Sequence, residues 1–335
     1  MAEIVLGIGT SHSPMLSLAP EHWDIRTDAD RAAPAHPYRG ETYSFEELKS
    51  VRDTARYTAL DTLENREASY AACQRHLDAL AAKLAEVDPD VLIIVGDDQK
   101  EWFFDDVQPA FVIYHGSSIR ALAVDASDPN LPPPMLPVRL SYWPAEDTDY
   151  PVDGALAEHI ILQTIEDRFD VTASRRPPAD AHGPRTIGHA FGFIYRRLLK
   201  DRPIPFVPIL INTYFPPNQP TAARCYEIGR SIARGIRSWE ADARVAVIAS
   251  GGLTHFVIDE AFDRKLLGAM LAGDRAAMTG DGNDAFQSGT SEIKNWIAAC
   301  GILEDSGLDM TLLDYVPCYR SEVGTGTGMA FATWT

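Results

Sequence analysis

Residues 4–14 read IVLGIGTSHSP, a short apolar run that stops at Gly9-Thr10-Ser11 and is followed at once by a histidine. A run of this kind predicts a buried strand. The polar segment with Pro14 ends the strand, because proline cannot continue strand pairing. His12 is therefore expected in the loop at the carboxyl end of a strand. Open α/β sheets bind their ligands at that edge, so His12 is the first candidate for a functional residue.

The rest of the chain alternates predicted strands with predicted helices. Apolar runs typical of buried strands occupy residues 91–95, 110–114, 207–212 and 245–250, with a weaker one near 169–173. Apolar residues at helical spacing fall at 62–87, 153–168, 220–238 and over most of 261–300. This alternation predicts one large α/β domain over residues 1–335, in which helices flank both faces of a central mixed, largely parallel sheet. A chain of 335 residues is long enough to bury the core of such a sheet.

Two stretches depart from this alternation. Residues 20–60 are polar and rich in proline and aromatic residues, and they predict an excursion with short helices inserted into the domain. An insertion of this length either covers a pocket as a lid or is simply tolerated. Residues 127–151 are rich in proline and predict a loop or a weakly structured edge.

The composition narrows the range of partners. Apolar residues make up 45% of the chain and charged residues 23%, as in globular proteins. The net charge of −18 repels phosphate backbones, so no nucleic-acid partner is expected. The four cysteines form no C-x-x-C pair and are expected to be reduced thiols in the cytoplasm. We find no signal peptide and no apolar run of membrane-spanning length, and we expect no membrane partner and a homodimeric assembly.

Titratable side chains follow several of the predicted strands. They are His12, the segment Asp97-Asp98-Gln99, His182 with His189, and His255. Each histidine alone would be interpreted as a capped or solvent-facing residue. Loops at one edge of a sheet converge in space, however, and polar groups that converge in one crevice are the usual mark of a binding site.

Two further features each have two readings. Glu292 lies in the first turn of a predicted helix, where the helix dipole favours a carboxylate, but the same carboxylate is also suited to bind a metal. The segment GTGTG at residues 324–328 lacks the lysine of a phosphate-binding loop. It is either an ordinary glycine turn or a place where Thr325 and Thr327 bind a substrate carboxylate or hydroxyl.

Taken together, these segments resemble the class III extradiol ring-cleavage dioxygenases, the family of the protocatechuate 4,5-dioxygenase β subunit. Blocks that match the family pattern occur in the same order along nearly the whole chain. They are GTSHSP (residues 9–14), Asp98-Gln99 with Phe103 and PAF (109–111), DAHG (180–183), NTYFPP (212–217) with Arg224-Cys225, GGLTH (251–255) and the stretch from Ser288 to Gly301. Within the family, the long excursion at residues 20–60 and the single-chain size look most like 3-O-methylgallate dioxygenases.

The resemblance implies a reaction and a set of roles. His12 and Glu292 would be two of three protein ligands to Fe(II), His255 would be the acid–base residue, and His182 would contact the substrate or oxygen. Two histidines and one carboxylate leave open positions on iron for a catechol and dioxygen. A histidine with a pKa near neutrality can take a phenolic proton and return it later. The ring of a catechol such as 3-O-methylgallate, gallate or protocatechuate would then open beside its diol, with both atoms of O₂ inserted.

The sequence departs from the family pattern at two places. Gln99 stands where the family has its second iron histidine, and an amide oxygen is a poorer donor to Fe(II) than an imidazole. The third ligand is therefore Gln99 itself or a substitute, for which the candidates are His36, Asp97, Asp98 and Glu101. The C-terminal S-N-T clamp of the family is replaced by Val323-Gly324-Thr325. The candidate substrate-binding residues are then Thr325, Thr327, Tyr319, Arg320 and His189.

These departures leave two other functions open. The chain could be a catalytically silent paralogue or subunit that keeps the fold without the metal. It could also perform another metal-assisted reaction, such as hydrolysis, because a fold does not fix the chemistry that it supports.

Overall fold

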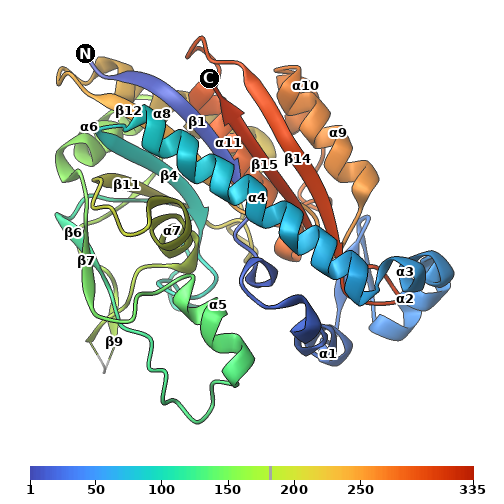
Figure 1. Cartoon of the computed structure of the whole chain (residues 1–335). Coiled ribbons are helices and arrows are strands. Elements are labelled where there is room, and N and C mark those ends of the chain that lie inside the picture. The colour runs from blue at the N-terminus through green and yellow to red at the C-terminus, as the bar shows by residue number, and fades with distance from the viewer. Residues whose placement is uncertain (181–182) are drawn as a thin grey trace.

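The computed structural model of the chain describes residues 1–180 and 183–335 (Figure 1). His182, which the sequence assigns to substrate or oxygen contact, lies outside the described residues.

A nine-stranded sheet forms the centre of the molecule, in the order β13-β15-β1-β12-β4-β11-β5-β8, with β14 paired to β15. The strands are β1 (Glu3–Thr10), β4 (Val91–Asp97), β5 (Phe111–Tyr114), β8 (Thr172–Ser174), β11 (Phe206–Ile211), β12 (Arg244–Ser250), β13 (His255–Val257), β14 (Met310–Tyr319) and β15 (Thr325–Trp334). Four central strands, β1, β12, β4 and β11, run parallel. Strands β15 and β5 join the two sides of this group antiparallel, so the sheet is mixed, as the sequence predicts.

Helices cover both faces of the sheet, which confirms the predicted fold class. The longer helices are α4 (Leu63–Val87), α6 (Gly154–Glu166), α8 (Ala222–Ser238), α9 (Glu260–Leu271) and α11 (Ile293–Leu303). Because side chains alternate along a strand, Ile93 and Val95 of β4 join the core under α6, α8 and α11. Their neighbours Leu92 and Ile94 join a second core under α4 and α7 (His189–Phe193). In Figure 1, α4 crosses one face of the sheet diagonally.

Residues 20–60 form a set of short elements at one end of the sheet (Figure 1). These elements are a 3₁₀ turn (Pro20–His22), α1 (Asp24–Ala32), the paired strands β2 (His36–Tyr38) and β3 (Glu41–Tyr43), α2 (Phe45–Val51) and α3 (Thr54–Leu60). Buried contacts fix this segment to the C-terminal strands. Asp30 of α1 accepts two hydrogen bonds from Arg320, at 2.7 and 2.8 Å, and Trp23 is buried.

The remaining elements are short. They are the 3₁₀ turns Pro14–Leu16, Pro133–Met135 and Ser288–Glu292, the π turn Ile194–Leu199, α5 (Leu136–Leu140), α10 (Arg275–Thr279), and the strand pairs β6 (Ser118–Ala121) with β7 (Thr148–Pro151) and β9 (Ala179–Asp180) with β10 (Gly183–Pro184). The stretch predicted as a loop or a weakly structured edge at 127–151 thus contains a 3₁₀ turn, a short helix and the strand β7. None of the helices in the described ranges is long and apolar enough to cross a membrane.

Only the first residue of the glycine-rich segment 324–328 belongs to a turn: the Gly324 N–H donates to the carbonyl oxygen of Ser321 at 3.0 Å, with φ at +72°. Thr325–Trp334 form the buried strand β15, and its glycines allow close packing against neighbouring backbone. A side chain at Gly326 would place its Cβ 2.0 Å from the carbonyl oxygen of Cys318, so only glycine fits there. The alternation of glycine and threonine therefore serves strand pairing between β14 and β15.

Candidate functional site

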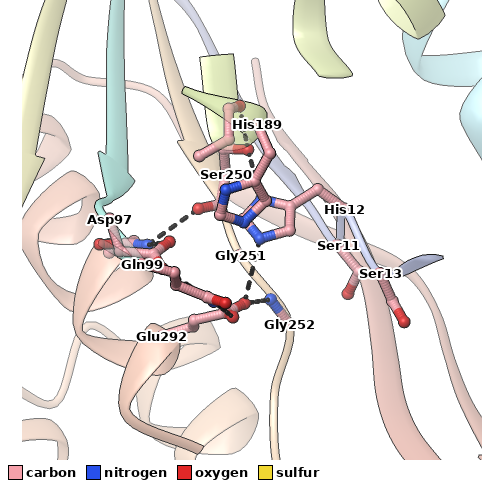
Figure 2. A network of polar contacts seen from close by, with 12 residues as sticks. Ser11, His12, Ser13, Asp97, Gln99, His189, Ser250, Gly251, Gly252 and Glu292 are labelled. Atoms are coloured by element: carbon pink, nitrogen blue, oxygen red, sulfur yellow. Dashed lines mark hydrogen bonds and ion pairs between the residues drawn. The ribbon is translucent and has the colours of Figure 1, made fainter. Parts of the chain in front are cut away.

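The carboxyl ends of the parallel strands β1, β12 and β4 meet at one edge of the sheet, where a cavity of about 310 Å³ opens. This volume is in the range of small-molecule sites. Predicted site residues from distant parts of the chain line it together: His12, Gln99, His189, His255, Glu292, Arg320 and Thr327. The expected convergence of loops thus brings together most of the candidates, and Figure 2 shows the central ones.

His12 is buried, and its hydrogen bonds define which ring nitrogen is free. The Ser250 hydroxyl donates its proton to the carbonyl oxygen of Ala190 at 2.7 Å, so it accepts from His12 Nδ1 at 2.9 Å. In the neutral form of the ring, His12 Nε2 then carries the lone pair. Within the described residues it makes no hydrogen bond, although Glu292 Oε2 lies 3.3 Å away (Figure 2). A buried imidazole nitrogen held in this state is typical of a metal ligand whose other nitrogen is fixed by a hydrogen bond.

Glu292 ends the 3₁₀ turn that precedes α11 and is only 2% exposed. Its Oε2 accepts a hydrogen bond of 2.7 Å from the backbone N–H of Gly252. Burial acts to raise the pKa of Glu292, but the imidazoles of His255 and His12 outweigh it and hold that pKa well below its usual value. The carboxylate is therefore ionised and directed at His12.

His255 begins β13, opposite Thr327 of β15. Its Nδ1–H donates to the carbonyl oxygen of Leu253 at 2.7 Å, and its Nε2 lies 3.1 Å from Glu292 Oε1. Burial lowers the pKa of His255, but the Glu292 carboxylate acts more strongly and raises it overall. The ring can thus hold a proton at Nε2, on the side that faces the cavity.

His189 is the first residue of α7, and Glu101 orients it. The backbone N–H and the Nδ1 of His189 bond the two carboxylate oxygens of Glu101 at 2.9 and 2.8 Å. Burial opposes a charge on His189, but the Glu101 carboxylate raises its pKa to about 10. Its ring packs edge-on against that of His12, with centroids 4.6 Å apart. Possible ligand atoms of His12, Asp97 and His189 all lie within 4.8 Å of one another.

Gln99 enters the site through its amide nitrogen. That nitrogen donates to Asp97 Oδ2 at 3.1 Å and to Glu292 Oε1 at 2.9 Å (Figure 2). Asp97 is fully buried, and burial together with the Glu292 charge raises its pKa. Gln99 therefore joins two carboxylates by hydrogen bonds, an arrangement that uses its donors rather than its oxygen.

Two further third-ligand candidates, Asp98 and His36, are engaged elsewhere, whereas Asp97 lies beside His12 and His189, and Glu101 lines the cavity and orients His189. Asp98 accepts the backbone N–H groups of Trp102 and Phe103 at 2.7 and 3.2 Å. His36 Nε2 bonds the carbonyl oxygen of Asp30 at 2.9 Å and is absent from the described lining of the cavity.

The substrate-binding candidates divide into two groups. Thr327 and Arg320 line the cavity, although the Arg320 guanidinium is already paired with Asp30. Thr325 bonds Ser321, and the Tyr319 hydroxyl donates to Glu260 at 2.7 Å. Neither is among the described residues that line the cavity. Buried packing of β14 and β15, rather than a ligand, explains their positions.

The cavity also contains residues that sequence reasoning missed. Arg26, Tyr142, Trp143 and Tyr214 line it, and the Tyr142 hydroxyl donates to the carbonyl oxygen of His12 at 2.7 Å. Tyr142 and Trp143 come from the proline-rich stretch and Arg26 from the excursion. Neither segment has a periodicity that would point to a site.

Comparison with known proteins establishes the family. The family model described as the catalytic LigB subunit of aromatic ring-opening dioxygenase matches residues 58–321, most of the chain, and the protein belongs to this family. The family expected from the motif blocks is thereby confirmed. His12 and the segment that contains Arg26 precede the matched residues.

Named relatives are more distant. A gallate dioxygenase from Pseudomonas putida is 35% identical over 115 residues, which are 33% of this chain and 31% of that protein. A 2,3-dihydroxyphenylpropionate/2,3-dihydroxicinnamic acid 1,2-dioxygenase from Photorhabdus laumondii is 29% identical over 177 residues, 52% of this chain and 46% of that protein. A protein of the same name from Burkholderia vietnamiensis is 27% identical over 274 residues, which are 73% of this chain and 85% of that protein. The match thus spans about a third and about a half of the first two relatives.

Proposed function

We propose that the protein is an Fe(II)-dependent extradiol dioxygenase. It would open the ring of a catechol-type aromatic acid beside its two hydroxyls and insert both atoms of O₂. The observation that carries this proposal is the free, buried Nε2 of His12 beside the ionised Glu292, in a cavity of a LigB family member. The relatives named for gallate and dihydroxyphenylpropionate support a catechol-type substrate. Gallate, 3-O-methylgallate and protocatechuate are the first candidates.

The donor set fits a divalent iron. His12 and His189 offer imidazoles and Asp97 a carboxylate within 4.8 Å of one another, and Glu292 offers a second carboxylate 3.3 Å from His12 Nε2. Two histidines with one carboxylate are typical of non-haem Fe(II) oxygenases. The buried side chains of Asp97 and Glu292 and the partly buried one of Glu101 gather acidic groups here, whose charge a cation would offset. We propose His12, Glu292 and His189 as the ligands. This revises the sequence-based proposal of Gln99, because the Gln99 amide donates to the carboxylates through its nitrogen.

The chain's own residues would divide the remaining work. When bound, iron supplies a positive charge that favours loss of phenolic protons and open positions for catechol and oxygen. His255 would accept a proton from a substrate hydroxyl at Nε2 and later return it, since Leu253 fixes its other nitrogen. The cavity walls, which include Tyr142 and Trp143, would limit the access of water to the ring.

Oxygen uptake tests the proposal directly. Protein loaded anaerobically with Fe(II) is mixed with gallate, 3-O-methylgallate or protocatechuate in air. We expect one O₂ consumed per substrate, with the absorbance of a ring-opened product. No uptake with any of a wider panel of catechols would reject the function. Turnover under strict anoxia would support hydrolysis instead, and a protein that neither contains nor rebinds metal would support a silent paralogue.

We also propose a cytoplasmic homodimer. All four cysteines are free and buried, which suits a reducing compartment. Sedimentation equilibrium of the purified chain measures the assembly, and a monomer at micromolar concentration would contradict it.

A further inference from the structure

Arg26 brings an unpaired positive charge to the wall of the cavity. It lies on α1, in the segment at residues 20–60, and lines the same cavity as His12 and Glu292. Its Nε is buried without a hydrogen-bond partner, and the described residues include no carboxylate in an ion pair with it. A guanidinium has five N–H donors and stays charged in proteins. Leaving such a group partly buried and unpaired costs free energy unless a ligand completes it.

The neighbouring arginines differ from Arg26 in this respect. Arg320 is bound by both carboxylate oxygens of Asp30, so its charge is balanced within the protein. Arg139 is exposed and lies over the ring of Trp143, 4.9 Å from its centroid. Burial and then the proximity of Arg320 lower the pKa of Arg26, and Asp30, which is already paired with Arg320, offsets only part of this. Arg26 is therefore the cavity arginine best placed to receive an anion.

We propose that Arg26 binds the carboxylate of the aromatic substrate and so selects ring diols that carry one. The proposal rests on the function proposed above and names its substrate class. The planar fork of a guanidinium matches a carboxylate through two parallel hydrogen bonds. Glu292 and Glu101, which also line the cavity, would repel a carboxylate. These charges orient the ring with its hydroxyls toward His12 and Glu292 and its carboxylate toward α1.

The test compares two substrates that differ only in the carboxylate. Gallate and pyrogallol share three adjacent hydroxyls, and pyrogallol lacks the acid group. For Arg26→Gln we expect kcat/KM for gallate to fall by about 10- to 100-fold, the usual effect of losing a hydrogen bond to a charged group. The value for pyrogallol should stay unchanged within error. Arg26→Lys should recover part of the loss, because it keeps the charge without the fork.

Arg31→Gln is the matched control. Arg31 lies on the same helix, but its side chain is at the surface and pairs with Glu322. We expect this variant to treat both substrates as the unsubstituted protein does. Anaerobic calorimetry of the iron-loaded protein with gallate and with pyrogallol provides a second readout, in which Arg26→Gln should weaken gallate binding alone.

The outcomes separate this proposal from the proposed function. If Arg26→Gln loses gallate and pyrogallol turnover equally, or loses neither, the role of Arg26 is wrong while the dioxygenase function stands. If the unsubstituted protein turns over neither substrate, the proposed function fails for them. Calorimetry then still decides whether Arg26 discriminates in favour of the carboxylate.

Discussion

At the scale of single residues, the site depends on how a few side chains orient two imidazoles. Ser250 fixes His12 from one side and Glu101 fixes His189 from another. Each partner engages Nδ1 of its ring, which leaves Nε2 as the nitrogen for a metal; His189, whose pKa is raised to about 10, would release a proton there on binding one. Hydrogen bonds of this kind set the tautomer of metal-binding histidines and strengthen them as ligands.

Replacing Ser250 with alanine should therefore weaken metal binding without unfolding the chain. Without the hydroxyl, the His12 ring loses the acceptor that holds its Nδ1–H. We expect Fe(II) affinity to fall by about 10- to 100-fold, measured by anaerobic equilibrium dialysis and metal analysis. Ser231→Ala removes another buried serine, one that bonds Asp167, and should leave affinity unchanged. Equal affinities for Ser250→Ala and Ser231→Ala would contradict the role of Ser250.

Fe(II) affinities of variants at His189 and Gln99 distinguish these two candidates for the third ligand. Loss of a residue that only hydrogen-bonds a metal ligand, such as Ser250, typically lowers metal affinity by about 10- to 100-fold. His189→Ala removes a ligand itself and should lower Fe(II) affinity by more than about 100-fold. Gln99→Ala should change it far less, because the Gln99 nitrogen only donates to Asp97 and Glu292. The same dialysis measurement decides between them. A large loss in Gln99→Ala with little change in His189→Ala would restore Gln99 as the ligand and exclude His189.

The sequence could predict part of this residue-level picture. His12, His255 and Glu292 follow from motif blocks, because each sits at a fixed place relative to a strand or turn. His189 was expected in the same crevice as His12, but its edge-on contact with the His12 ring could not be predicted. It depends on Glu101, which is remote in sequence and meets His189 only after α7 packs beside β4.

At the scale of elements, the site requires a helix to pack very closely on a strand. Helix α11 follows directly after Glu292, and its Trp296 lies against Gly9 of β1, the strand that leads to His12. A Cβ added at Gly9 would lie 2.3 Å from the Trp296 ring. The glycine thus sets the distance between the two elements that bear these residues.

Gly9→Ala should destabilise the protein for this reason. Overpacking of a core typically costs about 1–3 kcal/mol. We expect a lower unfolding midpoint in urea together with weaker Fe(II) binding. Gly268→Ala is the control, because Gly268 is in helix α9 with no atom near its added Cβ. Alanine there should be neutral or stabilising by up to about 1 kcal/mol. Similar unfolding midpoints for the two variants would show that α11 can move away from β1 without loss of stability.

A buried carboxylate couples α9 to the turn before His255. Asp263 accepts hydrogen bonds from the backbone and hydroxyl of Thr254, at 2.9 and 2.7 Å, and from the Tyr315 hydroxyl at 2.6 Å. Burial outweighs these bonds and raises the pKa of Asp263 from 3.8 to about 6. The folded state therefore holds this proton more tightly than the unfolded state does.

The sign of the resulting pH dependence is definite. Stability from this group is fully present below pH about 4 and is lost as pH rises through about 6. The pKa of Asp263 differs by about two units between the unfolded and folded states, which corresponds to a loss of up to about 3 kcal/mol in the free energy of unfolding. Asp263→Asn lacks the titration, so urea unfolding from pH 4 to 7 should show the unsubstituted protein losing stability relative to the variant as pH rises. If the free energy of unfolding of the two proteins changed with pH in the same way, the raised pKa of Asp263 would be contradicted.

The elements that periodicity reveals were predicted well. Strands β4, β11 and β12 and helices α4, α6 and α8 lie within a few residues of their predicted bounds. Strand β14 was not predicted, because its apolar residues show no simple alternation and its pairing with β15 is a tertiary contact. The glycines of β15 mimic a turn in sequence, although close backbone packing is their actual cause.

At the scale of the whole molecule, the two ends of the chain meet in the site. Strand β1 pairs with β15 near the C-terminus, and β1 leads to His12 while Glu292 precedes α11. The ligands proposed here, His12 and Glu292, are far apart in sequence and lie together only in the folded chain. A metal ion that binds them therefore binds the folded state and stabilises it by mass action.

Iron should accordingly raise the melting temperature. At a free concentration of 100 times its Kd, a ligand adds about 2.7 kcal/mol. For a chain of this size that amounts to a rise of several degrees, measured anaerobically by differential scanning calorimetry. His12→Ala and Glu292→Gln should lose the rise, whereas Arg31→Gln, at the surface of α1, should keep it. An equal rise in His12→Ala and the unsubstituted protein would mean that iron binds elsewhere, because a site spanning both chain ends cannot stabilise the fold without its N-terminal ligand.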